Sequence, residues 1–178
     1  MFLEHSNTEI RHAAAFGLGV LATKKGDVFE ENSTLYFGKL ATALKKQKET
    51  VKKLESKEGD DEEEGDDNIR EEKFTLDNIV AAIGKFIEAK PSLASETVAK
   101  EWLEQLPLKE DPTEAVHQGT VLANIILKEE YKQIKEFLLG SDGANKNAVI
   151  RVLEEMIADE TYEKNKEMLK EANSKVSQ

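Results

Sequence analysis

Apolar residues recur at spacings of three and four along almost the whole chain, with charged and polar residues between them. This period is typical of amphipathic α-helices, and no segment shows a convincing two-residue alternation that would indicate a strand. We therefore expect an all-α protein, with roughly seven helices arranged as antiparallel pairs.

The amino-terminal segment predicts the first helix. Asn7 or Thr8 can cap its start, and Gly26 can end it. Small side chains make this a thin face, which allows a neighbouring helix to come close. The glycines of the Gly17-Leu18-Gly19 run lie inside this helix without the strand and third glycine of a dinucleotide fingerprint, so we interpret them as packing residues. The apolar positions that share one predicted face are Ile10, Ala13, Ala14, Gly17, Leu18 and Leu21.

Further helices follow with recognisable start and stop signals. Ser33 or Thr34 can cap the second, Pro91 ends the third, Ser95 can cap the fourth, and Pro112 suits a first helical turn. Gly140 and Gly143 break the segment after residue 131, and the last segment, from residue 162, looks helical but only weakly apolar. The predicted core positions include Phe37, Leu40, Ala41, Leu44, Val51, Leu76, Ile79, Val80, Ile83, Phe86, Ile87, Ala115, Gly119, Leu122, Ile126, Val149, Val152, Leu153 and Met156.

Internal repetition favours a particular architecture. "AAFGLGVLA" (14–22) aligns with "IVAAIGKFI" (79–87), which places Leu18 opposite Ile83 at an offset of 65 residues. The next equivalent helix starts at Ala115, and a period of about 40 residues with two helices per unit is typical of HEAT and armadillo repeats. An insertion around an acidic stretch explains the longer first offset. A plain helical bundle is the alternative, because its helices would also be amphipathic and of similar length.

This reading divides the chain into an α-solenoid of about three and a half helix pairs. The predicted parts are a first repeat (1–56), an acidic flexible insertion (57–72), a second repeat (73–110), a third repeat (111–160), and a terminal helix with a frayed tail (161–178).

The acidic stretch "EGDDEEEGDD" (58–67) has carboxylates at eight of its ten positions. Like charges and two glycines with nothing to bury predict disorder. It is either a solvated loop or an electrostatic site for a Lys/Arg-rich partner, and it could also fold back on the basic segment 45–53 as autoinhibition. Calcium is disfavoured because Glu62 and Glu64 stand where an EF-hand loop has Asp or Asn. The candidate partner-binding carboxylates are Glu58, Asp60, Asp61, Glu62, Glu63, Glu64, Asp66 and Asp67.

Trp102 is the only tryptophan, and two interpretations are open. It is either a core residue or an aromatic anchor for a partner on the inner surface of a solenoid.

Composition narrows the classes of function. The 178 residues carry a formal net charge of −11, which argues against nucleic acid as a partner because phosphate binding needs clustered Lys and Arg. There is no cysteine, no secretory signal and no apolar run of membrane-spanning length, so we expect a soluble intracellular protein without membrane insertion. His5, His12 and His117 lack metal-ligand spacing, and no nucleophile turn or phosphate loop occurs. We expect no enzyme activity, cofactor or metal.

Three segments together resemble successive HEAT repeats near the carboxyl end of importin-β-type nuclear transport receptors (karyopherins). They are "EIRHAAAFGLGVLA" (9–22), "DNIVAAIGKFIEAKP" (77–91) and "WLEQLPLKEDPTEAVHQGTVLANII" (102–126). The subgroup that imports ribosomal proteins and histones looks most similar. The resemblance implies a HEAT solenoid that binds basic protein cargo without catalysis and is located in the cytoplasm and the nucleus. A HEAT-repeat scaffold or adaptor outside transport is the alternative.

Two departures from that family matter. Its members are several times longer, so we expect this chain to be a carboxyl-terminal fragment whose Ran GTPase contacts would lie in amino-terminal repeats outside it. The acidic insertion matches no family loop residue by residue. We also expect apolar surface to be exposed around Ala13, Ala14 and Gly17, which would make the isolated chain marginally stable or self-associating.

Overall fold

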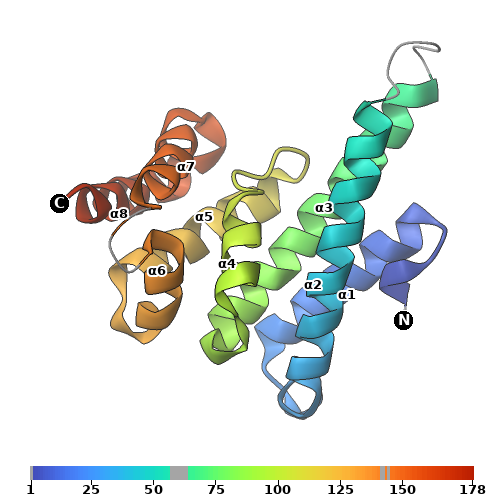
Figure 1. Cartoon of the computed structure of the whole chain (residues 1–178), viewed down its shortest axis with the longest axis horizontal. Helices are drawn as coiled ribbons and strands as arrows, with labels where there is room; N and C mark the ends of the chain where they lie inside the picture. Colours follow the sequence, from blue (N-terminus) through green and yellow to red (C-terminus); the bar gives the residue numbers. More distant parts are fainter. Residues whose placement is uncertain (1, 57–63, 141–142, 144) are drawn as a thin grey trace. The chain divides into compact units, whose positions relative to one another are not determined.

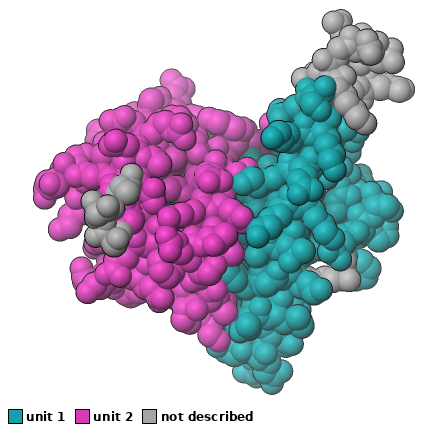
Figure 2. All heavy atoms as spheres, viewed as in Figure 1, with its two compact units in different colours: residues 1–89 teal, residues 90–178 magenta. Residues whose placement is uncertain are grey.

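The computed structural model describes residues 2–56, 64–140, 143 and 145–178, and it places the backbone but not the side chains of residues 64–66. The described residues form α-helices and short 3-10 helices without a strand, which confirms the all-α prediction. The chain divides into two compact units, Met1–Ala89 and Lys90–Gln178 (Figure 2). Each unit has its own helices and its own buried residues.

The described residues of unit 1 form three long helices (Figure 1). They are α1 (Thr8–Lys24), α2 (Asp27–Glu55) and α3 (Glu64–Ala89), preceded by the 3-10 turn η1 (Phe2–Glu4). Helices α2 and α3 are antiparallel, because an ion pair joins Glu55 to Lys73 near one end and the rings of Phe29 and Phe86 lie 5.2 Å apart near the other.

Helix α1 runs parallel to α3 rather than antiparallel to it. Arg11 contacts Glu72 near the start of both helices, and the ring of His12 meets that of Phe74 edge-on at 4.7 Å. Further along, Gly19 approaches α3 closely: a Cβ built on it would lie 3.5 Å from the Cα of Ala82. The offset between contacting residues stays between 61 and 66 along the pair, which shows that the two helices run in the same direction.

The buried face of α1 differs from the predicted one. Its fully buried residues are Ala15, Gly19 and Ala22, whereas Ala13 and Gly17 are exposed. The predicted face did not include Ala15, Gly19 and Ala22, because alanine and glycine carry little hydrophobic signal and periodicity does not distinguish a stripe of small residues from its neighbours. The exposure of Ala13 and Gly17 agrees with the expectation of uncovered apolar surface there. The side that holds only small residues is the one that α3 can approach.

Two predicted boundaries in unit 1 were also wrong. Helix α2 begins at Asp27, with Gly26 as its N-cap, so Ser33 is a buried residue inside the helix rather than a cap. Helix α3 begins at Glu64, so residues 64–72 are helical and do not belong to a flexible insertion. Acidic side chains in the first turn are favourable to a helix because they face its positive end. Residues 57–63 of the predicted insertion lie outside the described residues.

Unit 2 is built from five shorter helices with 3-10 turns between them (Figure 1). The signals predicted at Ser95, Pro112 and Gly140 are confirmed: Ser95 accepts a hydrogen bond from the backbone N–H of Val98, α5 starts at Pro112, and α6 ends before Gly140. The elements are η2 (Pro91–Leu93), α4 (Glu96–Leu103), α5 (Pro112–Leu127), η3 (Glu129–Tyr131), α6 (Lys132–Leu139), α7 (Lys146–Ala158), η4 (Glu160–Asn165) and α8 (Lys166–Ser177).

The core of unit 2 is centred on α5. Ala115, Gly119, Leu122 and Ile126 are buried as predicted, and η4 packs directly on this helix. A Cβ added to Gly119 would lie 3.0 Å from the ring of Tyr162, so only glycine fits there without a shift of the ring. The predicted core residues of α7 are buried as well: Val149, Val152, Leu153 and Met156.

Candidate functional site

The predicted partner-binding carboxylates fall into three groups. Glu58, Asp60, Asp61, Glu62 and Glu63 lie outside the described residues. Glu64 and Asp66 belong to the first turn of α3, and their side chains are not described. Asp67 is on the same helix and exposed to solvent. The acidic stretch is thus continuous in sequence with the start of α3, and its role in binding a basic partner stays a prediction.

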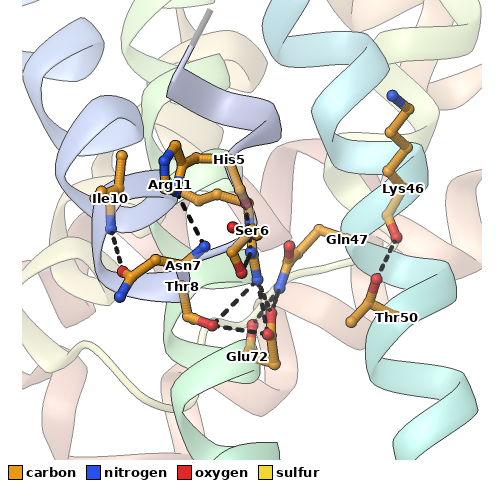
Figure 3. A network of polar contacts seen from close by, with 10 residues as sticks. All are labelled: His5, Ser6, Asn7, Thr8, Ile10, Arg11, Lys46, Gln47, Thr50 and Glu72. Atoms are coloured by element: carbon orange, nitrogen blue, oxygen red, sulfur yellow. Dashed lines mark hydrogen bonds and ion pairs between the residues drawn. The ribbon is translucent and has the colours of Figure 1, made fainter.

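A polar network fixes the helix that carries the end of this acidic stretch. Figure 3 shows side chains of α1 and α2 converging on the carboxylate of Glu72, one turn and a half beyond Asp67. The Nη2 of Arg11 lies 2.6 Å from each carboxylate oxygen, and the Thr8 hydroxyl donates to Oε1 at 2.9 Å. Gln47 donates from Nε2 to Oε2 at 2.5 Å and to the Glu72 carbonyl at 2.9 Å.

The network keeps Glu72 ionised although it is buried. Burial alone would raise the pKa of Glu72, but the hydrogen bonds from Arg11, Gln47 and Thr8, together with the Arg11 charge, outweigh burial and hold the pKa below its usual value. Arg11 is held in turn, because its Nη1 donates to the carbonyls of His5 and Ser6 at 2.8 and 3.0 Å. The network therefore joins all three helices of unit 1 just beyond the acidic start of α3.

Sequence reasoning missed Glu72, although a signal was present. Glu72 lies on the line of Ile69, Leu76, Ile79 and Ile83, so it occupies an inward position of an otherwise apolar face. A carboxylate at such a position needs buried hydrogen-bond donors. Their identity could not be predicted, because Gln47 and Arg11 are 25 and 61 residues away in the chain.

Two ion pairs join elements of unit 1, one through Lys46 of α2 and one through Lys73 of α3. Lys46 binds the exposed Glu4 of η1, with 2.6 Å between Nζ and Oε1. Lys73 on α3 binds Glu55 at the end of α2, at 2.9 Å. Autoinhibition would join residues 45–53 to the acidic stretch 58–67, most of whose side chains lie outside the described residues, so it stays a prediction.

Trp102 is a core residue of unit 2. Its side chain is fully buried, and its indole N–H donates to Oε1 of Gln118 on α5 at 3.1 Å. A buried ring with a satisfied N–H cannot contact a partner without local opening of the unit. The structure therefore contradicts the interpretation of Trp102 as a surface anchor and favours the core alternative.

The side of α1 that faces solvent is unusually apolar. Its largest side chains are Phe16, Val20 and Ile10, with exposed fractions of 50%, 38% and 37%. Ala13 and Gly17, which were expected to be exposed, lie between them, and Ala14 is half-buried. Exposed apolar surface on a folded unit is typical of sites of protein contact, so this side of α1 is a candidate site. We call it the outer α1 face: Glu9, Ile10, Ala13, Phe16, Gly17, Val20, Thr23 and Lys24.

The described part of the chain was also compared with the requirements of a metal site and of a membrane-spanning helix. No cluster of three or more His, Cys, Asp or Glu side chains there has an arrangement that could hold a metal ion. Among the same residues, no helix combines the length and apolar character needed to cross a membrane. No protein-family model matches the chain.

Proposed function

We propose that this chain is a HEAT-type helical-repeat module that binds basic protein cargo in nuclear import and catalyses no reaction. Its acidic stretch would attract Lys/Arg-rich segments, and its helices would provide the binding surface. The resemblance of three of its segments to the carboxyl-terminal repeats of importin-β-type receptors motivates this choice of function and a location in the cytoplasm and nucleus. Contacts with the Ran GTPase would belong to amino-terminal repeats outside this chain.

The parallel packing of α1 and α3 is the observation that best supports a repeat architecture. Equivalent helices of successive repeats stack side by side in the same direction, whereas helices adjacent in sequence alternate. The observed contact offsets of 61 to 66 residues include the 65 by which the two segments align in sequence.

Charge supports the choice of a basic partner. The chain has a net charge of −11, and eight carboxylates are concentrated between residues 58 and 67. The helix on which this run ends is anchored through Glu72 to both neighbouring helices of its unit. An anchored helix keeps the described end of the acidic run at a fixed place on unit 1, which favours a partner with clustered positive charge.

Neutralising the acidic stretch tests the proposal without changing its length. A variant with the eight carboxylates of residues 58–67 replaced by their amides should bind a labelled Lys/Arg-rich peptide at least about tenfold more weakly at low salt. Amides are a better replacement than a Gly/Ser linker, because a linker would break the first turn of α3.

The matched control removes the same number of charges from unit 2. Amide replacements there should leave peptide binding nearly unchanged, because the positions are exposed and lie outside the acidic stretch in the sequence. Equal loss in both variants would mean that net charge, not this stretch, attracts the peptide. The control positions are Glu129, Glu130, Glu136, Glu154, Glu155, Glu160, Glu163 and Glu171.

A non-transport HEAT scaffold is the second candidate, and the outer α1 face favours it. That face is apolar at its centre, so a partner bound there would not need positive charge. If the chain is such a scaffold, its protein partners should still bind at physiological salt. They should also bind the variant whose acidic stretch carries amides. A peptide bound only through the acidic stretch would argue for the transport function instead.

A further inference from the structure

The composition of the outer α1 face is not explained by packing within the chain. Gly17 lies in the middle of the helix, where glycine weakens helical structure. A Cβ added to it would meet nothing within 4 Å, in contrast to Gly19, where a Cβ would lie 3.2 Å from the side chain of Lys85. Gly19 therefore lies in close contact with α3, whereas Gly17 has no intramolecular reason to be glycine.

The order of residues along this face is self-complementary. Consider a point midway between Phe16 and Gly17, and a second α1 helix turned antiparallel about it. Val20 of each copy then lies level with Ala13 of the other, and Phe16 lies level with Gly17, so large residues stand opposite small ones. Such a pairing of one patch with itself is the arrangement that a two-fold dimer requires.

The charges at the two ends of the face fit the same register. Glu9 lies seven and a half residues before the midpoint and Lys24 lies the same distance after it, and both are exposed. In the antiparallel pair each Glu9 therefore stands level with Lys24 of the second copy. A parallel pair would instead bring Glu9 level with Glu9 and Lys24 level with Lys24, which is unfavourable.

We propose that the outer α1 face binds a second copy of this chain, as an antiparallel two-fold pair of α1 helices centred between Phe16 and Gly17. This goes beyond the proposed function and does not depend on it. A single helix of 17 residues offers less area than the roughly 800 Å² per partner of a standard interface, so the dimer is weak and forms at high protein concentration.

Charge reversal tests both the dimer and its register by sedimentation equilibrium. The weight-average mass of the unmodified chain should rise from 19.9 kDa towards twice that value with concentration. Glu9→Lys alone and Lys24→Glu alone should each raise the dimer Kd, because like charges then face one another. An equimolar mixture of the two variants should restore association, since the introduced lysine of one chain then faces the introduced glutamate of the other. The double variant should restore it for the same reason.

A second measurement fixes the register independently. The chain has no cysteine, so single cysteines can be introduced on a clean background. On mild oxidation, a mixture of Ala13→Cys and Val20→Cys should give a mixed disulfide dimer. Each variant alone should not, because identical positions are about 10 Å apart along the axis at 1.5 Å per residue.

Point variants distinguish dimerisation through the outer α1 face from nonspecific association. Val20→Glu should raise the dimer Kd at least about tenfold, whereas Met168→Glu, at an exposed methionine of unit 2, should not change it. Far-UV circular dichroism verifies that the variants stay helical. A chain that is monomeric at every concentration, association unaffected by Val20→Glu, or a charge-reversal mixture that associates no better than its components would each overturn the proposal.

Discussion

Glu72 joins the helices of unit 1, since three side chains from two other helices donate to its carboxylate. Replacing Glu72 by Gln keeps the shape but removes the charge and the ion pair with Arg11. We expect the free energy of unfolding of unit 1 to fall by about 1–3 kcal/mol, the contribution typical of hydrogen bonds to charged groups. Hydrogen exchange of α1 and α3 amides would measure this loss directly.

The control for this variant is Glu4→Gln. Glu4 also pairs with a lysine, Lys46, but both side chains are largely exposed, and exposed pairs contribute little. Its exchange rates in α1 and α3 should stay close to those of the unmodified chain. If both variants had the same effect, burial of the Glu72 network would not be what stabilises the unit.

The lowered pKa of Glu72 also predicts a pH dependence. A carboxyl whose pKa is lower when folded contributes stability above its unfolded pKa, near the model-compound value of 4.5, and loses it as the pH falls through the folded pKa. The stability difference between the unmodified chain and Glu72→Gln should therefore be largest near neutral pH. It should shrink as the pH falls below 4.5, and a difference that grew on acidification would contradict the assignment.

Two glycines in helix interiors should respond in opposite ways to alanine. Gly17→Ala should stabilise unit 1 by about 0.5–1 kcal/mol, because the methyl group meets open space and alanine favours helix. Gly119→Ala should destabilise unit 2 by about 1–3 kcal/mol, because its methyl group would press on Tyr162. Thermal unfolding of both variants would show shifts of opposite sign, and stabilisation by Gly119→Ala would mean that Tyr162 moves freely.

At the scale of single residues, the roles that depend on neighbours in the sequence could be predicted. Asn7 and Ser95 are caps because their side chains accept from a backbone N–H three residues later, a contact contained within one short segment. Trp102 could not be placed, because its burial depends on Gln118 of a different helix. Residues whose roles depend on distant partners are those for which the sequence left alternatives open.

At the scale of elements, the start of α3 combines an acidic run with a helix terminus. Asp67 is in the first turns of the helix, where a negative charge is stabilised by the helix dipole. Asp67→Asn should raise hydrogen exchange of the amides that follow it, and Asp67→Lys should raise it more. Equal rates in all three proteins would show that the dipole does not contribute to this helix start.

The sequence predicted which segments are helical better than it predicted which face of each helix is buried, and both results have one physical reason. Large apolar residues such as Leu40, Ile83 and Leu153 carry strong signals, and all three are buried as expected. In α1 the buried residues are Ala15, Gly19 and Ala22, of which Gly19 lies close to α3, while Phe16 and Val20 are exposed to solvent. There, close backbone approach rather than side-chain size determines which face is buried.

At the scale of the whole molecule, the all-α character was predictable and the grouping of helices was not. Roughly seven helices were expected, and the described residues contain eight. The repeat pattern assigned α3 to a second repeat, whereas α3 packs on both α1 and α2 in unit 1. Such contacts depend on residues far apart in the chain, which periodicity does not reveal. Stacking of successive repeats would also produce them, so the repeat boundaries stay predictions.

The salt dependence of peptide binding tests the central claim most directly. A labelled Lys/Arg-rich peptide and a charge-balanced peptide of the same length should be titrated against the intact chain from low to physiological salt. We predict that the basic peptide binds at low salt, that its affinity falls steeply as salt is added, and that the charge-balanced peptide binds weakly throughout. Equal binding of the two peptides, or an affinity for the basic peptide that does not change with salt, would contradict a function based on the acidic stretch.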